Sequence, residues 1–394
     1  MKNTKKLVTA LALTFALLGL AGCNMLGGEN GGEGVPPDPK EAAYVEVIPF
    51  IYEETGNFSE GLVSVMLDGK WGFIDETGAE VIPFIYDAAF DFSEGLAAVK
   101  LDGRAGYVDK TGAEVIPFIY EGASDFSEGL AAVSYPDIPS LDPHIVFINK
   151  TGEVITPRYY SAEPFTEGLA VVQHGMMNYV YIDTSGTEVI SIEGTNRGKP
   201  FSNGLALIYH FEDKYFIDKT GAVVIDLESI DGVSTFIGST ESFSDGLALV
   251  DTHNIPEKGN RNRGYIDTTG TLVFTTEGFA QGFSEGLAVV GFLRGMGYID
   301  LTGEVVIEGK YDWAHDFSDG FAAVELDGKM GFINKEGEEV VPFVYDIPVL
   351  SLGEFEDELS WVDEDGFAMY YKKVSEGMAA VQLGGKWGFI KLLK

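Results

Sequence analysis

Carboxylate side chains recur along this chain at a spacing that could bring them into one surface. A phrase of the form Phe-Ser-Glu-Gly-Leu, or a close variant, occurs nine times at intervals of 34, 34, 39, 36, 42, 40, 34 and 57 residues. The copies begin at Phe58, Phe92, Phe126, Phe165, Phe201, Phe243, Phe283, Phe317 and Val374. Acidic groups repeated in this way could bind a cation or serve as acid and base. Turn formation is the simpler interpretation, because serine bonds nearby amides and glycine readily adopts φ > 0.

Other signatures of catalysis or metal binding are missing from the sequence. Asn203 stands in place of the acid in the fifth copy, which argues against a required carboxylate. There is no phosphate loop, Gly-x-Ser-x-Gly elbow, His-Glu-x-x-His motif or cysteine pair. The acidic stretches at 226–232 and 363–366 do not complete a calcium loop. We therefore expect no enzymatic activity, metal or cofactor; a hydrolase would need a carboxylate pair in a cleft.

Aromatic side chains supply a second possible chemistry. Trp71 and Trp387 occupy equivalent places in Lys-Trp-Gly-Phe-Ile segments and could stack on sugars, although repeated aromatic positions more commonly pack between units. Trp361 lies in an acidic insertion at 348–373 that departs most from the repeat. Insertions in a regular array usually gather on one face, so this segment and the shorter ones at 135–145 and 254–263 are the expected recognition surface. The candidate ligand-binding residues are Trp71, Trp387 and Trp361.

Each repeat reads as three β-strands. In the second unit, residues 96–101 and 106–109 flank an Asp-Gly turn, and Thr111-Gly112 leads into a third run at 114–120. These runs are rich in Val, Ile, Phe and Tyr and show no helical period. Pro83, Pro117 and Pro342 fall inside the third run, which predicts an edge strand or a bend because proline cannot donate to a ladder.

Such units must stack, because their first two strands carry apolar residues on both faces. The array opens at 45–52 with a strand of the third type alone and closes at 387–390 with a strand of the second type. A ring could complete its last unit with the strand from the other end. We therefore predict an all-β tandem array of about nine three-stranded units, and favour a propeller-like ring over an open β-solenoid or superhelix.

The first residues predict export and a lipid anchor. Residues 1–22 combine three early lysines with an apolar run, which is typical of a signal peptide. The run ends in Leu-Ala-Gly-Cys, which resembles the lipobox of bacterial lipoproteins and implies cleavage before Cys23 and lipidation of its sulfur. Residues 23–40 are rich in glycine and proline and predict a tether before the array at 41–394. We expect a lipid-anchored, extracytoplasmic protein on the cell surface or the periplasmic face.

The charge of the chain limits its partners. The formal net charge is −36, and removal of the signal would remove three lysines and no acids. Such a surface repels nucleic acid and anionic headgroups, so the expected contact with the membrane runs through lipidated Cys23 alone.

The Lys-Trp-Gly-Phe-Ile segments, each after a Glu-Gly-apolar strand, resemble the bacterial WG repeat over about residues 45–394, although only two units keep the tryptophan. This resemblance implies an interaction role and carries over no catalytic residue. The function we predict is a non-enzymatic binding or scaffold protein of the cell envelope that contacts another protein. A carbohydrate-binding module for cell-wall or environmental glycans is the alternative, motivated by the aromatic positions.

Overall fold

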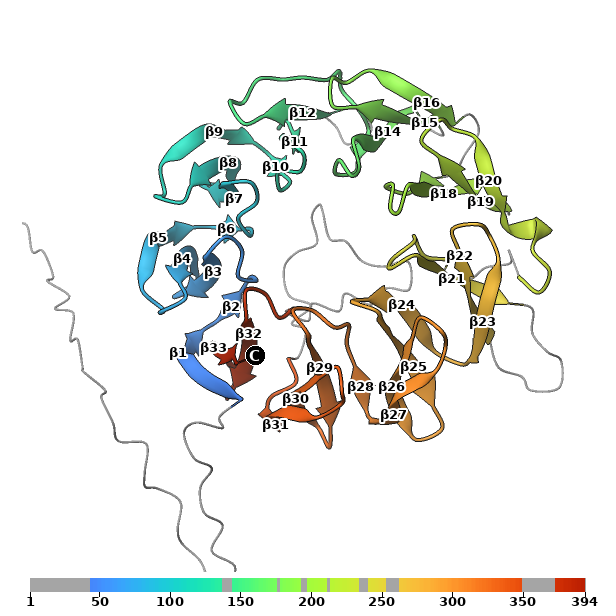
Figure 1. Ribbon diagram of the computed structural model, residues 1–394. Coiled ribbons are helices and arrows are strands. Elements are labelled where there is room, and N and C mark those ends of the chain that lie inside the picture. The colour runs from blue at the N-terminus through green and yellow to red at the C-terminus, as the bar shows by residue number, and fades with distance from the viewer. Residues whose placement is uncertain are drawn as a thin grey trace, which may run out of the picture. The chain divides into compact units, whose positions relative to one another are not determined.

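The computed structural model describes residues 43–136, 144–175, 178–192, 197–210, 213–233, 240–252, 262–348 and 373–393. Residues 42–394 form one compact unit. Within it, the described strands build nine small antiparallel sheets that stand as blades around a common centre (Figure 1). The protein is thus a nine-bladed β-propeller, and the predicted ring is confirmed.

The strands follow one another through the blades in chain order, except that β1 belongs to the last blade. The first three blades contain β2 (Glu54–Thr55), β3 (Leu62–Leu67), β4 (Lys70–Asp75) and β5 (Glu80–Tyr86); β6 (Ala88–Ala89), β7 (Leu96–Leu101), β8 (Arg104–Asp109) and β9 (Glu114–Tyr120); and β10 (Gly122–Ala123), β11 (Leu130–Ser134) and β12 (Ile145–Asn149). The next three contain β13 (Ser161–Ala162), β14 (Leu169–Gly175), β15 (Asn178–Asp183) and β16 (Glu188–Ile192); β17 (Arg197–Gly198), β18 (Leu205–His210), β19 (Asp213–Asp218) and β20 (Val223–Asp226), followed by a 3-10 turn (Leu227–Ser229); and β21 (Leu247–Thr252), β22 (Asn262–Asp267) and β23 (Leu272–Glu277). The last three contain β24 (Ala280–Ser284), β25 (Leu287–Phe292), β26 (Gly295–Asp300) and β27 (Val305–Tyr311); β28 (Trp313–Ala314), β29 (Phe321–Leu326), β30 (Lys329–Asn334) and β31 (Glu339–Tyr345); and β32 (Met378–Leu383), β33 (Lys386–Leu392) and β1 (Tyr44–Tyr52).

Most blades have one strand more than the three expected from the repeat. In six of the described sheets a further strand precedes the three of the repeat, and it lies nearest the centre of the ring (Figure 1). This strand has two residues in five of these sheets and five residues, in β24, in the sixth. In the second blade this strand is β6, which pairs Ala88 with Lys100 and Ala89 with Val99. Two paired residues are too few to produce an alternating pattern, which is why the sequence gives no sign of this strand.

The third long strand of the repeat forms the outer edge of its blade and is bulged, as its proline predicts. In the first blade Ile82 pairs with Phe73, and Tyr86 pairs with Trp71, so that three residues of β5 stand opposite one residue of β4. That one residue is Gly72. A Cβ there would lie 2.7 Å from the Ile82 carbonyl oxygen, so the bulged strand approaches too closely for any other residue.

The two ends of the array meet in one sheet. Strand β1 pairs antiparallel with β33, with Tyr44 opposite Leu392, Ile48 opposite Phe389 and Tyr52 opposite Trp387. The lone outer strand at the start of the array therefore completes the blade that lacks one at the end. This pairing closes the ring.

The hydrophobic core lies between the blades. One cluster joins Phe73, Ile82 and Tyr86 of the first blade to Phe92 and Val99 of the second, all of them buried. Equivalent clusters bridge the other pairs of neighbours. Both faces of each sheet are thus covered by adjacent blades, as the apolar strands indicate, and no blade has a core of its own.

Candidate functional site

The Ser-Glu-Gly phrase forms a tight hairpin turn at the inner side of each blade. In the first copy Ser59 and Leu62 exchange two backbone hydrogen bonds of 2.9 and 3.2 Å. The two residues between them, Glu60 and Gly61, have φ of 55° and 84°. Two successive positive φ values define a type I′ turn, which favours glycine at its second centre. Turn formation, rather than catalysis, thus accounts for the spacing of the phrase.

The carboxylate of each turn reaches the next blade. Glu60 accepts a hydrogen bond of 3.1 Å from the backbone amide of Gly95, the equivalent glycine of the second blade. The same contact recurs between Glu94 and Gly129, Glu128 and Gly168, Glu167 and Gly204, Asp245 and Gly286, Glu285 and Gly320, Asp319 and Gly377, and Glu376 and Gly61. We call this contact the seam clasp. Asn203 occupies the position in the fifth blade and supplies no carboxylate.

The serine of the turn also bonds across the seam. We expected it to bond local amides, but Ser59 Oγ donates to the Phe92 carbonyl oxygen at 2.6 Å. Equivalent bonds run from the turn serines of other blades, and that of the ninth, from Ser375 Oγ to the Phe58 carbonyl oxygen at 2.6 Å, returns to the first. A repeat spaced 34 residues apart places the partner carbonyl beside the hydroxyl only after the blades have stacked, so the local sequence could not indicate this contact.

The seam clasp of Glu60 should contribute measurably to the free energy of unfolding. Burial alone would raise the pKa of Glu60, but hydrogen bonds from Lys110 and the Gly95 amide outweigh it and hold the pKa below its usual value. Replacing Glu60 with alanine should lower the free energy of unfolding by about 1 kcal/mol at pH 7, measured by urea denaturation. Glu60→Gln keeps an acceptor oxygen and should lose less. Equal losses would assign the effect to the 2.9 Å ion pair with Lys110 instead.

The tryptophans of the Lys-Trp-Gly-Phe-Ile segments pack between blades. Trp387 is 5% exposed and lies in a core cluster with Tyr52, Phe58 and Phe389. Trp71 is partly buried against the cluster that joins the first and second blades. These positions give the aromatic residues the packing role that repeated aromatics usually have. Trp361 and Cys23 lie outside the described residues, as do most of the insertions at 348–373, 135–145 and 254–263.

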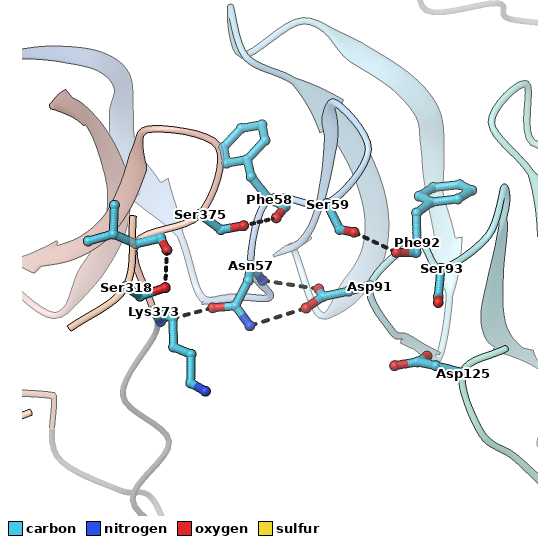
Figure 2. Close-up of a pocket in the computed structure, with 11 residues that line it drawn as sticks. Asn57, Phe58, Ser59, Asp91, Phe92, Ser93, Asp125, Ser318, Lys373 and Ser375 are labelled. Carbon is cyan, nitrogen blue, oxygen red and sulfur yellow. Dashed lines mark hydrogen bonds between the residues drawn. The ribbon is translucent and has the colours of Figure 1, made fainter. Parts of the chain in front are cut away.

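A polar pocket of about 330 Å³ opens on the inner side of the ring where the chain ends meet. It is lined by the residues that begin the phrase in five neighbouring blades, namely Asn57, Phe58, Ser59, Asp91, Phe92, Ser93, Asp125, Ser318, Lys373, Val374 and Ser375. Figure 2 shows Asn57 between Asp91 and Lys373, with Asp125 beyond Asp91. No local sequence motif indicates this pocket, because its residues belong to distant parts of the chain.

Asn57 organises the pocket. Its backbone amide and its Nδ2 donate to the two carboxylate oxygens of Asp91 at 3.0 and 3.1 Å, while its Oδ1 accepts from the Lys373 amide at 3.2 Å (Figure 2). One amide side chain thereby fixes groups from three blades. Both oxygens of Asp91 are held as acceptors, which suits the ionised carboxylate.

Asp125 is the second carboxylate of the pocket. The protein atoms around its carboxyl group desolvate it, and this raises the pKa of Asp125 to about 6, with a further contribution from the charge of Asp91. The residue as a whole is nonetheless exposed to solvent. The pocket can thus offer a fixed anionic acceptor, a carboxyl group that gains its proton near pH 6 and the ammonium of Lys373. This set suits recognition of a polar or cationic group.

Further charged residues precede the repeat phrase in other blades, one position earlier than Asp91 and Asp125 do. Glu163 lies 3.6 Å from Arg197 in an ion pair, and burial raises the pKa of Glu163 despite this cation. Burial raises the pKa of Glu241 to about 7, because the opposing charge of Arg263 compensates for it only in part. Among the residues that the structure describes, no group of three or more histidine, cysteine or acidic side chains is placed to hold a metal ion.

Comparison with protein families agrees with the repeat read from the sequence. The family described as "WG containing repeat" matches residues 45–71, 71–104, 106–135, 147–175, 296–329, 330–366 and 370–387, together more than half of the chain. The chain belongs to the WG containing repeat family. The matches leave out the fifth and sixth blades of this WG repeat protein, although both contain the three long antiparallel strands of the repeat. No curated protein shows significant sequence similarity to the chain.

Solved structures align with this chain at low sequence identity. A eukaryotic initiation factor aligns with a TM-score of 0.50 and 10% identity over 73% of this chain and 86% of its own. BamB from Moraxella catarrhalis aligns with a TM-score of 0.37 and 12% identity over 89% and 100% of the two chains. The WD40 beta propeller domain of Doa1 aligns with a TM-score of 0.32 and 10% identity over 63% and 91%. At these identities the likeness concerns the fold alone.

The described part of this WG repeat protein contains no helix with the length and apolarity needed to cross a bilayer.

Proposed function

We propose that this WG repeat protein is a non-enzymatic binding protein of the bacterial cell envelope, anchored through lipid on Cys23, that recognises another protein with its rigid ring. The proposal rests on the contacts that the repeated polar groups make. The turn carboxylates and serines bond neighbouring blades to one another, so the repeat builds a closed frame rather than a row of reactive groups. Propellers of β-repeats often serve as surfaces for protein interaction.

The pocket at the closure of the ring is the natural place to look for a partner. It joins the first three blades to the last two, so any ligand there contacts residues from both ends of the chain. A photo-cross-linking residue in place of Asp125 should give a discrete protein adduct in intact cells. The matched control is the same residue at Pro164, which directly precedes Phe165 as Asp125 precedes Phe126 but does not line the pocket.

The outcomes of this experiment separate the alternatives. One protein adduct at position 125 and none at position 164, identified by mass spectrometry, supports a specific protein partner. Recovery of glycan at position 125 would favour the carbohydrate-binding alternative. Adducts of equal kind and yield at both positions would show unspecific contact and would count against the proposal.

A hydrolase is the second candidate, because the pocket contains two carboxylates in different surroundings. Both oxygens of Asp91 accept hydrogen bonds from Asn57, while the pKa of Asp125 is raised to about 6. Such a pair can divide the roles of base and acid. Hydrolysis of chromogenic glycosides or esters by the purified chain, abolished by Asp125→Asn, would establish this candidate. We favour binding because both Asp91 oxygens already accept hydrogen bonds from the protein.

A further inference from the structure

An apolar surface follows the outer rim of four consecutive blades. The eighth, ninth, first and second blades each end in an outer strand of one pattern, Glu followed by two apolar residues, Pro, Phe, an aliphatic residue and Tyr, in β31, β1, β5 and β9. The aliphatic residue before the tyrosine is exposed to nearly the same extent in all four: Val344 47%, Ile51 45%, Ile85 46% and Ile119 47%. We call these four residues and their strands the apolar arc. The other described outer strands do not share the Pro-Phe pattern.

Aromatic rings pack across the seams beneath the apolar arc. Phe84 of the first blade lies 6.4 Å from Tyr52 of the ninth, ring centre to ring centre. The same pairing joins Phe118 to Tyr86 and Phe50 to Tyr345. The exposed aliphatic side chains therefore stand on a packed base rather than over open gaps. Apolar side chains repeated at one place on four neighbouring blades can together form an interaction site.

The edge strands of the apolar arc cannot pair with a strand from a partner protein. Pro49, Pro83, Pro117 and Pro342 lie in the four edge strands, and each strand is bulged where it meets its neighbour. An edge strand with proline and a bulge cannot present a regular ladder to another strand. A partner would thus contact the side chains of the arc.

The charges that border the arc indicate the chemistry of the partner. Each of the four strands has an exposed glutamate at or near its beginning: Glu339, Glu46, Glu80 and Glu114. Glu80 and Glu114 lie close enough to Tyr52 and Tyr86 of the preceding blades to raise the pKa of these tyrosines, in addition to burial. The border is therefore acidic directly above each seam. A second copy of this chain or an anionic membrane would place like charges against it.

We infer that the apolar arc docks a protein segment with an apolar face flanked by lysine or arginine side chains. The inference rests on the proposed protein-binding function and assigns it a surface and a class of partner. Apolar contact supplies the affinity, and the glutamates select for cationic flanks and reject acidic ones.

The test compares two quadruple variants of the full chain. The arc variant carries Val344→Ser, Ile51→Ser, Ile85→Ser and Ile119→Ser. The control variant carries Val189→Ser, Val223→Ser, Val273→Ser and Val305→Ser, which replace outer-strand residues of equal or greater exposure in other blades. All eight positions are exposed, so both variants should fold. The probe is a synthetic amphipathic peptide of leucine and lysine, with a leucine–glutamate peptide as its charge-reversed counterpart.

The arc variant should bind the leucine–lysine peptide at least about tenfold more weakly than the unsubstituted chain, while the control variant stays within about twofold. The leucine–glutamate peptide should bind neither. Equal loss in both variants, or equal binding of the two peptides, would overturn the inference. Arc-dependent binding to phosphatidylcholine vesicles, or arc-dependent dimerisation in sedimentation, with no such effect on the peptide, would also overturn it.

The two proposals can fail separately. If the adduct at position 125 forms but the arc variant binds peptide normally, the proposed function stands and the arc is wrong. If no protein adduct forms at position 125 while the arc variant alone loses peptide binding, the pocket is not the place of protein binding and the inference on the apolar arc stands.

Discussion

Replacing Gly388 with valine should lower the free energy of unfolding by about 3 kcal/mol or more and open the ring. Gly388 lies in β33, opposite the bulge of β1. A Cβ at this position would stand 2.8 Å from the carbonyl oxygen of Ile48 and 2.8 Å from the ring of Phe50. The first of these is a backbone atom, so the added side chain can be accommodated only by displacing β1. Because β1 comes from the other end of the array, its displacement breaks the pairing with β33 that closes the ring.

Two measurements check this result. Urea denaturation reports the loss of stability, and small-angle X-ray scattering should show a larger radius of gyration for the variant under native conditions. Gly175→Val is the matched control, since Gly175 also lies in a strand and a Cβ there would meet only the Asn178 Cβ at 3.7 Å. A loss of stability that is equal in the two variants would show that the cost arises from strand glycine in general and not from ring closure.

Replacing Glu241 with glutamine should stabilise the protein at alkaline pH by on the order of 2 to 3 kcal/mol. Burial raises the pKa of this carboxyl group to about 7 from an ordinary value of 4.5. Below pH 4.5 the group is protonated in both the folded and the unfolded chain and contributes no difference. As pH rises from 4.5 through 7, the unfolded chain ionises it first, and the folded chain is progressively destabilised. Glutamine removes that ionisation and keeps an acceptor for the Gly282 amide.

The check is a series of denaturation curves between pH 4.5 and 8.5. The stability of Glu241→Gln relative to the unsubstituted chain should rise with pH and level off above 7. Glu60→Gln should move in the opposite sense, because the pKa of Glu60 is lowered in the folded chain and its contribution is present above the unfolded pKa. Parallel pH profiles for the two variants would contradict the assignment of Glu241 as a carboxyl group whose ionisation destabilises the folded chain.

Much of the fold could be predicted because it is local and repeated. The Asp-Gly and Ser-Glu-Gly turns lie between strands whose neighbours in space are also neighbours in sequence, so turn chemistry and apolar runs were enough to locate them. The proline of the outer strand predicted an edge, and the unpaired runs at residues 45–52 and 387–390 predicted the closure that β1 and β33 form. The two-residue inner strands were missed because so short a pairing leaves no periodic signal.

The candidate site could not be predicted in the same way. Asn57, Asp91, Asp125 and Lys373 each precede a copy of the repeat phrase and vary in type from blade to blade, so no motif groups them. They share a pocket only because the ninth blade stands beside the first.

The sequence by itself determined the repeat, its all-β character, the acidic charge and the strand types at the two ends, because these depend on side-chain chemistry within about forty residues. Tertiary structure alone decided what the repeated polar groups do. Glu60 and Ser59 find their partners in Gly95 and Phe92, and Glu376 and Ser375 find theirs in Gly61 and Phe58, more than three hundred residues away. The physical reason is that a hydrogen bond acts over about 3 Å of space, and only the closing of the ring brings these distant residues to that distance.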